Sequence, residues 1–127
     1  MTAVFAIFII LHGLAHLWYV TLSLNVIPFK SEFGWSGDSW LLTNFISGSV
    51  SPTIATIVYA IAALGLVCAG VGLLMDHQLF RPIMLWSAIL SLSAIGLFWD
   101  GNTSQIIEKG LIGFVINVIV IIGLLLL

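Results

Sequence analysis

The feature that most constrains this chain is its N-terminal run, residues 1–27, which contains no Asp, Glu, Lys or Arg. A helix needs only about 20 apolar residues to cross the hydrocarbon core of a bilayer. Over all 127 residues only 6% are charged and 61% are hydrophobic, whereas soluble domains carry about 25% charged residues. We therefore predict an all-α integral membrane protein that forms a single domain over residues 1–127.

The sequence also bears on a signal peptide, a nucleic-acid partner and a disulfide. The N-terminal run has no basic n-region and exceeds the apolar core of a signal peptide, so a retained helix is expected. The formal net charge is −2 and no basic run occurs, which excludes nucleic acid as an expected partner. The lone Cys68 excludes an intramolecular disulfide.

Apolar segments predict a bundle of four transmembrane helices, at about residues 2–26, 52–75, 82–99 and 104–127. Pro28 is expected to end the first helix, because proline lacks the backbone N–H that a helix requires. Pro52 and Pro82 are expected at the first positions of the second and third helices, where that N–H is dispensable. Asn102 and Gln105 have the spacing of a capping pair, so the fourth helix is expected to begin near them.

The first connection, residues 29–50, is too long for a tight turn and mixes Trp35 and Trp40 with Ser, Gly and Asn. Tryptophan is enriched at membrane–water interfaces. We expect a short interfacial helix here, beginning at Ser39 and capped by Asp38, that is re-entrant or lies on the surface. An ordered loop outside the membrane is the alternative.

Four crossings place both termini at one face of the membrane. Arg81 faces one side and Lys30 and Lys109 the other, so the positive-inside count discriminates little. Because long loops translocate whatever their charge, the termini are predicted to be cytoplasmic.

Polar residues of the first helix form one stripe. His12, His16 and Tyr19 lie at offsets 0, 4 and 7, which fall on one helical face. Ionisable groups at membrane depth normally face a bundle interior, a cavity or a partner, so this stripe is predicted to point inward.

Counting about 1.5 Å of rise per residue places Ser91 and Asn117 level with His12, roughly 15 Å from the face of the termini. Five residues are thus predicted to form a ligand-binding site or a polar core: His12, His16, Tyr19, Ser91 and Asn117. Interhelical hydrogen bonds that fix helix register explain the same pattern without any ligand.

Several classes of ligand suit such a stripe to different degrees. Histidines at i, i+4 suit zinc when a third ligand is near, but no Asp or Glu shares their depth, so no metal site is predicted. A haem or another tetrapyrrole could take His12 or His16 as an axial ligand. A quinone or lipid needs only a few hydrogen bonds within apolar walls. Proton relay would need more titratable groups than Tyr19 and Tyr59 supply.

The second helix carries two faces of small residues, which favour close helix contact in membranes. One holds Thr53, Thr56, Ala60, Ala63 and Gly70, and the other holds Ala62, Gly65, Ala69 and Gly72. Either the helix is sandwiched within the bundle, or one face meets another membrane subunit or a second copy of the chain.

The His12-Gly13 pair followed by His16-Leu17, together with Gly113 and Asn117 in the fourth helix, resembles small four-helix membrane proteins of the DoxX-like group of bacteria and archaea. In the DoxX pattern a lysine is expected where this chain has His16. The resemblance implies a prokaryotic plasma membrane, and at most an accessory role beside quinone-linked complexes.

No carboxylate pair, nucleophile motif or phosphate loop is visible in the sequence. The predicted function is therefore a non-catalytic one: an accessory or assembly subunit of a membrane complex, or a binder of a small apolar ligand such as a quinone or lipid. The alternatives are a redox or pigment protein that uses His12 and His16, and a transporter of protons or small solutes.

Overall fold

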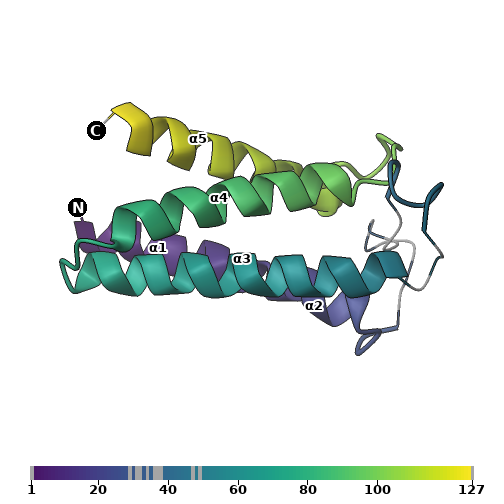
Figure 1. Ribbon diagram of the computed structural model, residues 1–127, viewed down its shortest axis with the longest axis horizontal. Helices are drawn as coiled ribbons and strands as arrows, with labels where there is room; N and C mark the ends of the chain where they lie inside the picture. Colours follow the sequence, from purple (N-terminus) through teal and green to yellow (C-terminus); the bar gives the residue numbers. More distant parts are fainter. Residues whose placement is uncertain are drawn as a thin grey trace.

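The computed structural model describes residues 2–28, 30, 33, 35, 39–46, 48 and 50–126. Its helices are α1 (Thr2–Ala15), α2 (Leu17–Ser23), α3 (Val50–Leu74), α4 (Phe80–Leu97) and α5 (Ile112–Leu126), the last preceded by a π-helical segment, Ile107–Leu111 (Figure 1). The described residues contain no strand. The all-α prediction is confirmed.

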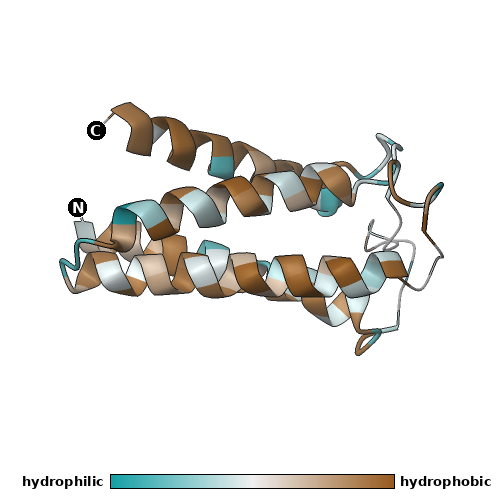
Figure 2. Ribbon diagram, viewed as in Figure 1, coloured by the Kyte–Doolittle hydropathy of each residue, from teal (hydrophilic) through white to brown (hydrophobic). Residues whose placement is uncertain are grey.

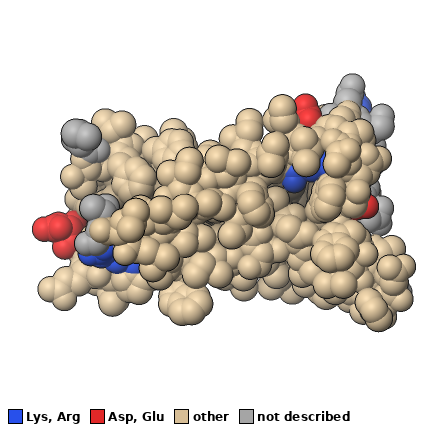
Figure 3. Space-filling view, turned by 90° about the horizontal axis from the view of Figure 1, so that it is seen from above, with Lys and Arg blue, Asp and Glu red and all other residues tan. Residues whose placement is uncertain are grey.

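Four helical spans are long and apolar enough to cross a membrane: Thr2–Ser23, Val50–Leu74, Phe80–Leu97 and Ile107–Leu126. Hydrophobic residues dominate their length (Figure 2). On the face seen in Figure 3, charged residues gather toward the two ends and leave a wide uncharged middle. Both termini lie at one end of the bundle (Figure 1). This composition is that of an integral membrane protein.

The first span ends at Ser23 rather than at residue 26, and Pro28 is not what ends it. Asn25 adopts a left-handed conformation, with φ of 54°. The Val26 N–H donates to Thr21 O and the Asn25 N–H donates to Leu22 O, both at 3.0 Å. This pair of bonds is a Schellman motif, which satisfies the last helical carbonyls before the proline is reached.

The predicted start of the fourth helix is wrong. Asn102 Oδ1 accepts a bond of 2.8 Å from the Ser104 N–H, and Gln105 has a φ of 53° that a helix cannot contain. The π-helical turn therefore begins only at Ile107. Helices α3 and α4 begin two residues before their predicted starts, so Pro52 and Pro82 occupy third positions, where a backbone N–H still lacks an intrahelical partner.

The described part of the first connection forms consecutive turns over residues 39–46 rather than the regular short helix expected. Ser39 is nevertheless a capping residue, because its Oγ accepts from the Leu42 N–H at 3.1 Å. The predicted cap, Asp38, lies outside the described residues. Trp35 Nε1 donates to Phe98 O and Trp40 Nε1 donates to Gly96 O, each at 2.9 Å. These bonds fasten the connection to the end of α4.

Helix α3 is the centre of the bundle and packs against α1, α2 and α4, while α5 packs against α4. A Cβ at Gly13 of α1 would lie 2.9 Å from Leu66 Cβ and 3.0 Å from Ala63 O of α3. On the other side, a Cβ at Gly65 would collide with Ser87 of α4. Small residues thus let α3 approach α1 and α4 closely. The helix is sandwiched within its own chain.

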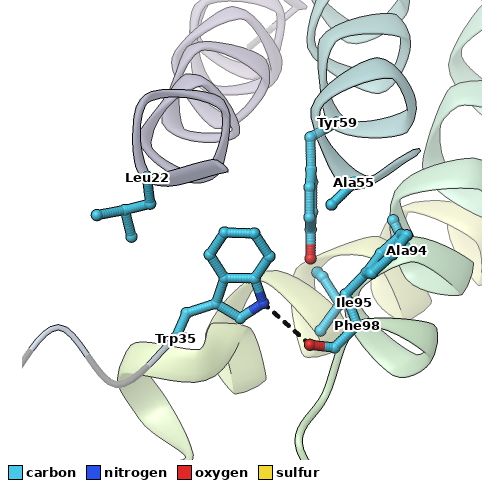
Figure 4. Packing of buried hydrophobic residues seen from close by; sticks show 7 residues of the cluster. All are labelled: Leu22, Trp35, Ala55, Tyr59, Ala94, Ile95 and Phe98. Carbon is cyan, nitrogen blue, oxygen red and sulfur yellow. Dashed lines mark hydrogen bonds between the residues drawn. The ribbon is translucent and has the colours of Figure 1, made fainter. Parts of the chain in front are cut away.

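Two apolar clusters fill the bundle. The one at the loop end is drawn in Figure 4 and consists of Leu22, Trp35, Ala55, Tyr59, Ala94, Ile95 and Phe98. The one nearer the termini consists of Ile9, Leu66, Ala69, Met84, Ala88 and Val120. The predicted polar residues fall between these clusters along their helices, so they occupy the middle of the membrane span.

Candidate functional site

The first transmembrane span is broken at His16, which forms the turn between α1 and α2. Its backbone N–H donates to Gly13 O at 3.1 Å, three residues back. Its ring Nδ1 donates instead to His12 O at 2.8 Å, the carbonyl that a regular α-helical bond would use. The His16 ring N–H thus replaces the His16 backbone N–H as the donor to His12 O. The turn at His16 thus coincides with a ring N–H that competes with the backbone N–H for the His12 carbonyl.

Four of the five predicted site residues meet in one hydrogen-bonded cluster, which joins α1, α4 and α5. His12 Nε2 lies 3.1 Å from Asn117 Oδ1. Asn117 Nδ2 donates to Ser91 Oγ at 2.7 Å, and Ser91 Oγ is also bonded to His16 Nε2. All four side chains are buried. The levels obtained by counting helical rise agree with these contacts.

The direction of every proton in the cluster follows from chemistry. A carbonyl only accepts, so His16 Nδ1 carries a proton, and a neutral ring then leaves Nε2 as an acceptor for the Ser91 hydroxyl. Ser91 Oγ in turn accepts from the Asn117 amide, whose Oδ1 accepts from His12 Nε2–H. The four side chains and the His12 carbonyl form a closed circuit, hereafter the histidine circuit. It is complete with both imidazoles uncharged, the form that the membrane interior favours.

One ring nitrogen stands outside the histidine circuit. Within the described part of the chain, Nδ1 of His12 has no hydrogen-bond partner. Every fully enclosed side-chain nitrogen or oxygen of the described residues does have a partner. Nδ1 of His12 is therefore an accessible acceptor rather than an enclosed one.

Tyr19 lies beside the circuit and is not one of its members. Its hydroxyl donates to Glu108 O at 3.3 Å, and its ring stacks on Tyr59 with centroids 4.8 Å apart. The Glu108 carbonyl belongs to the π-helical segment, which is kinked at Gly110, where the φ of 106° is not helical. Tyr19 thus satisfies a carbonyl of the irregular turn in the last span, as His16 does for His12 in the first.

A groove lies between α1 and α5, and two residues of the circuit, His12 and His16, line it. One section, of about 390 Å³, is lined by His12, His16, Tyr19, Gly110, Gly113 and Ile116 among others. The next, of about 380 Å³, is lined by Phe5, Phe8, Ile116, Ile119, Val120, Gly123 and Leu124. Ile116 lines both, so the two sections adjoin at this residue. We call the whole the α1–α5 groove. Non-helical backbone at membrane depth is tolerated where it lines such a cavity.

Sequence reasoning missed Ile116 and Gly123 as groove residues. Their separation of seven residues places them on one face of the last helix. This spacing is the sequence pattern that could have predicted a shared position in the groove. A polar residue on that face would have drawn attention to it, but both are apolar.

A second polar contact, also not predicted, lies at the loop end. Lys109 Nζ lies 2.8 Å from Asp100 Oδ2 and donates to Asn102 O at 3.1 Å. Partial burial acts to raise the pKa of Asp100, but the bonds from Lys109 and the Asn102 N–H and the lysine charge outweigh it and leave that pKa below 3.8. Lys109 is only 6% exposed. The pair therefore fixes the wide turn that precedes α5.

Metal chemistry finds little support in the geometry. The described residues contain no group of three or more His, Cys, Asp or Glu that could hold a metal ion. Cys68 is exposed and lines a separate groove of about 330 Å³ between α3 and α4, together with His77. It therefore lies on another side of the bundle from the α1–α5 groove.

Comparisons with family models, curated proteins and solved structures find no match for this chain. The resemblance to the DoxX-like group accordingly stays a prediction.

Proposed function

We propose that this protein binds a small amphiphile, a quinone or a lipid, in the α1–α5 groove. The apolar body of the ligand lies along Phe5, Phe8 and Gly123, and its polar head lies beside His12 and His16. The observation that carries the proposal is that a section with apolar walls adjoins, at Ile116, a section lined by His12 and His16. Each section has a volume within the 300–1,000 Å³ typical of ligand sites.

The irregular backbone on both walls supports the same function. The break at His16 and the π-helical turn at Gly110 flank the same section of the groove. Continuous helices would cost less in a purely structural bundle, because each irregular turn frees carbonyl groups that need other partners. Strained or irregular segments concentrate at binding sites.

The histidine circuit limits the alternative of a redox or pigment protein to one nitrogen. A metal or haem iron needs a ring nitrogen with a free lone pair. Nε2 of both His12 and His16 is bonded within the circuit, so Nδ1 of His12 is the nitrogen of the two described rings that this alternative would use. An absorption spectrum and metal analysis of the purified protein test this alternative directly, and a coloured or metal-loaded protein would favour it over the amphiphile.

We further propose a non-catalytic role as an accessory subunit in a prokaryotic plasma membrane, with the termini cytoplasmic. The resemblance to DoxX-like proteins supports the membrane and the accessory role. Because both small-residue faces of α3 are used inside the chain, contacts with other subunits or a second copy would use other surfaces. Reporter fusions to the C-terminus and to the loop of residues 29–50 test the orientation, and an external C-terminus would overturn it.

Mass spectrometry of organic extracts tests ligand binding. The protein is purified from native membranes in a mild detergent, and the molar ratio of bound quinone and lipid is measured. Gly123→Phe is the informative variant, because a Cβ on Gly123 has no atom within 4 Å and the ring would enter the α1–α5 groove. Gly96→Phe is the matched control, since Gly96 is equally open and lines a neighbouring cavity beside Trp99 and Lys109. That cavity shares Ile95, but neither Gly113 nor Gly123, with the α1–α5 groove.

The proposal predicts one amphiphile at near-stoichiometric ratio in the wild type and in Gly96→Phe, and its loss in Gly123→Phe. Loss in Gly96→Phe alone would move the site to the other cavity. No specific amphiphile in the wild type would overturn the proposal. Helical content and elution volume establish that each variant is folded, and Gly123→Val replaces Gly123→Phe if the larger side chain prevents folding.

A further inference from the structure

We infer that the ligand of the α1–α5 groove carries a hydroxyl head group that donates a hydrogen bond to Nδ1 of His12. This inference rests on the proposed function and names the chemical class of its ligand. Hydroxyl-headed amphiphiles include hydroquinones and lipid alcohols such as diacylglycerol. The corresponding quinone, which has only carbonyl acceptors, would be disfavoured.

The ring N–H groups of both histidines and the Ser91 hydroxyl all donate hydrogen bonds within the histidine circuit. His16 Nδ1–H is donated to His12 O and His12 Nε2–H to Asn117 Oδ1. The Ser91 hydroxyl is donated to His16 Nε2, as the direction of the circuit requires. Ser91 and Asn117 are completely buried, with 0% exposure, so neither side chain reaches a ligand. The histidines present no free N–H to the groove.

The His12 ring nitrogen that the circuit does not use, Nδ1, is a hydrogen-bond acceptor. The Nδ1 lone pair of His12 has no partner in the described chain and is not fully enclosed. Cε1 of His12, which is bonded to both ring nitrogens, lies 3.8 Å from the position of a Cβ on Gly113. Both residues line the same section of the groove. The ring edge that carries Cε1 therefore borders the groove section that Gly113 also lines.

The Tyr19 hydroxyl, which lines the same wall, is also a hydrogen-bond acceptor. The Tyr19 hydroxyl donates to Glu108 O at 3.3 Å, so its oxygen also offers lone pairs. A ligand carbonyl beside these groups would meet acceptors without a donor, and a buried unpaired polar group is costly. A ligand hydroxyl would donate a hydrogen bond to Nδ1 of His12, so the hydroxyl proton would not be left unpaired.

Affinity for two matched pairs of probes tests the inference. One pair is a decyl-substituted benzohydroquinone and its benzoquinone, measured anaerobically on the full chain in nanodiscs. The other is a diacylglycerol and the same lipid with its hydroxyl acetylated. One neutral hydrogen bond corresponds to a roughly three- to tenfold difference in affinity. The donor should bind tighter in at least one pair, and the pair with the higher affinity identifies the source of the ligand.

His12→Gln links the preference to the ring. A glutamine amide can still donate to Asn117 Oδ1 from near the place of Nε2, but it has no acceptor at the place of Nδ1. In this variant, the two probes of each pair should bind with about equal affinity. The preference for the donor should persist in the control Thr21→Ala, since the Thr21 hydroxyl donates to Trp18 O, within the same transmembrane span. A preference that survives His12→Gln would overturn the assignment to His12.

The outcomes separate this inference from the proposed function. Equal or tighter binding of the quinone and the acetylated lipid would overturn the hydroxyl inference and leave the proposed function standing. Failure of all four probes to bind the wild type would overturn the proposed function itself. The wild-type comparison decides the matter even if His12→Gln does not fold.

Discussion

His12 of α1 and Asn117 of α5 share a hydrogen bond of 3.1 Å although 105 residues separate them in the chain. Helix α5 otherwise packs against α4 and the π-helical segment. The bond therefore joins the first and last transmembrane spans across the α1–α5 groove. It also determines which His12 nitrogen is left for a ligand, so one contact serves both the bundle and the proposed site.

Asn117→Leu is expected to destabilise the protein by about 1–2 kcal/mol. The change removes two interhelical hydrogen bonds, each worth roughly 0.6 kcal/mol in a membrane. Unfolding in increasing SDS, followed by circular dichroism, measures the effect. Thr56→Ala is the control, because that hydroxyl donates to Pro52 O of its own helix. Equal effects of the two substitutions would contradict an interhelical role for Asn117.

Gly13→Ala should weaken the packing of α1 on α3 by about 1–3 kcal/mol, the usual cost of overfilling a core. The new methyl group would lie 3.0 Å from Ala63 O and 3.1 Å from Val67 N, and backbone atoms cannot move aside individually. The same SDS titration compares it with Gly123→Ala, whose Cβ would meet no atom within 4 Å. Destabilisation of Gly123→Ala to the same extent would show that loss of glycine, rather than helix contact, is responsible.

The sequence predicts much of the candidate site because helices are rigid and regular. The i, i+4 spacing of His12 and His16 gave a shared face, and helical rise gave the level of Ser91 and Asn117. These residues meet in the structure. Composition alone predicted the four spans, since a membrane accepts few other structures.

Irregular backbone is what the sequence did not predict. Pro28 is a visible stop signal, but the left-handed Asn25 ends the helix first. The break at His16 depends on a side chain that competes for the carbonyl of His12, and helix propensity does not record such competition. The π-helical turn and the anchoring of Trp35 and Trp40 depend on partners far away in the chain.

Trp35→Phe should loosen the first connection without unfolding the bundle. Trp35 is 3% exposed, its Nε1–H donates to Phe98 O, and its ring meets Tyr59 edge to face at 6.1 Å (Figure 4). Phenylalanine keeps part of the ring contact but loses the bond, so proteolysis within residues 29–50 should become several-fold faster. Trp86→Phe, at a 68% exposed position on α4, should leave the cleavage rate unchanged. Equal rates for Trp35→Phe and the wild type would contradict the anchoring role.

Asp100→Asn should destabilise the protein by about 1–3 kcal/mol above pH 5, since it removes the charged hydrogen-bond partner of a buried lysine. The pKa of Asp100 is lowered in the folded state. Its ionised form thus contributes stability that is complete above the ordinary value of 3.8 and is lost as the pH falls through the lower folded value. The difference between wild type and Asp100→Asn should therefore shrink below pH 3.8.

Thermal unfolding in detergent from pH 3 to pH 7 measures this trend. The matched control is Asp76→Asn, at an exposed turn position with φ of 53°, a conformation that asparagine also tolerates. It should change stability by less than about 0.5 kcal/mol. A difference for Asp100→Asn that stays constant down to pH 3 would show that the carboxylate charge is not its source. Its disappearance would tie the turn before α5, and with it one wall of the α1–α5 groove, to the Lys109–Asp100 pair.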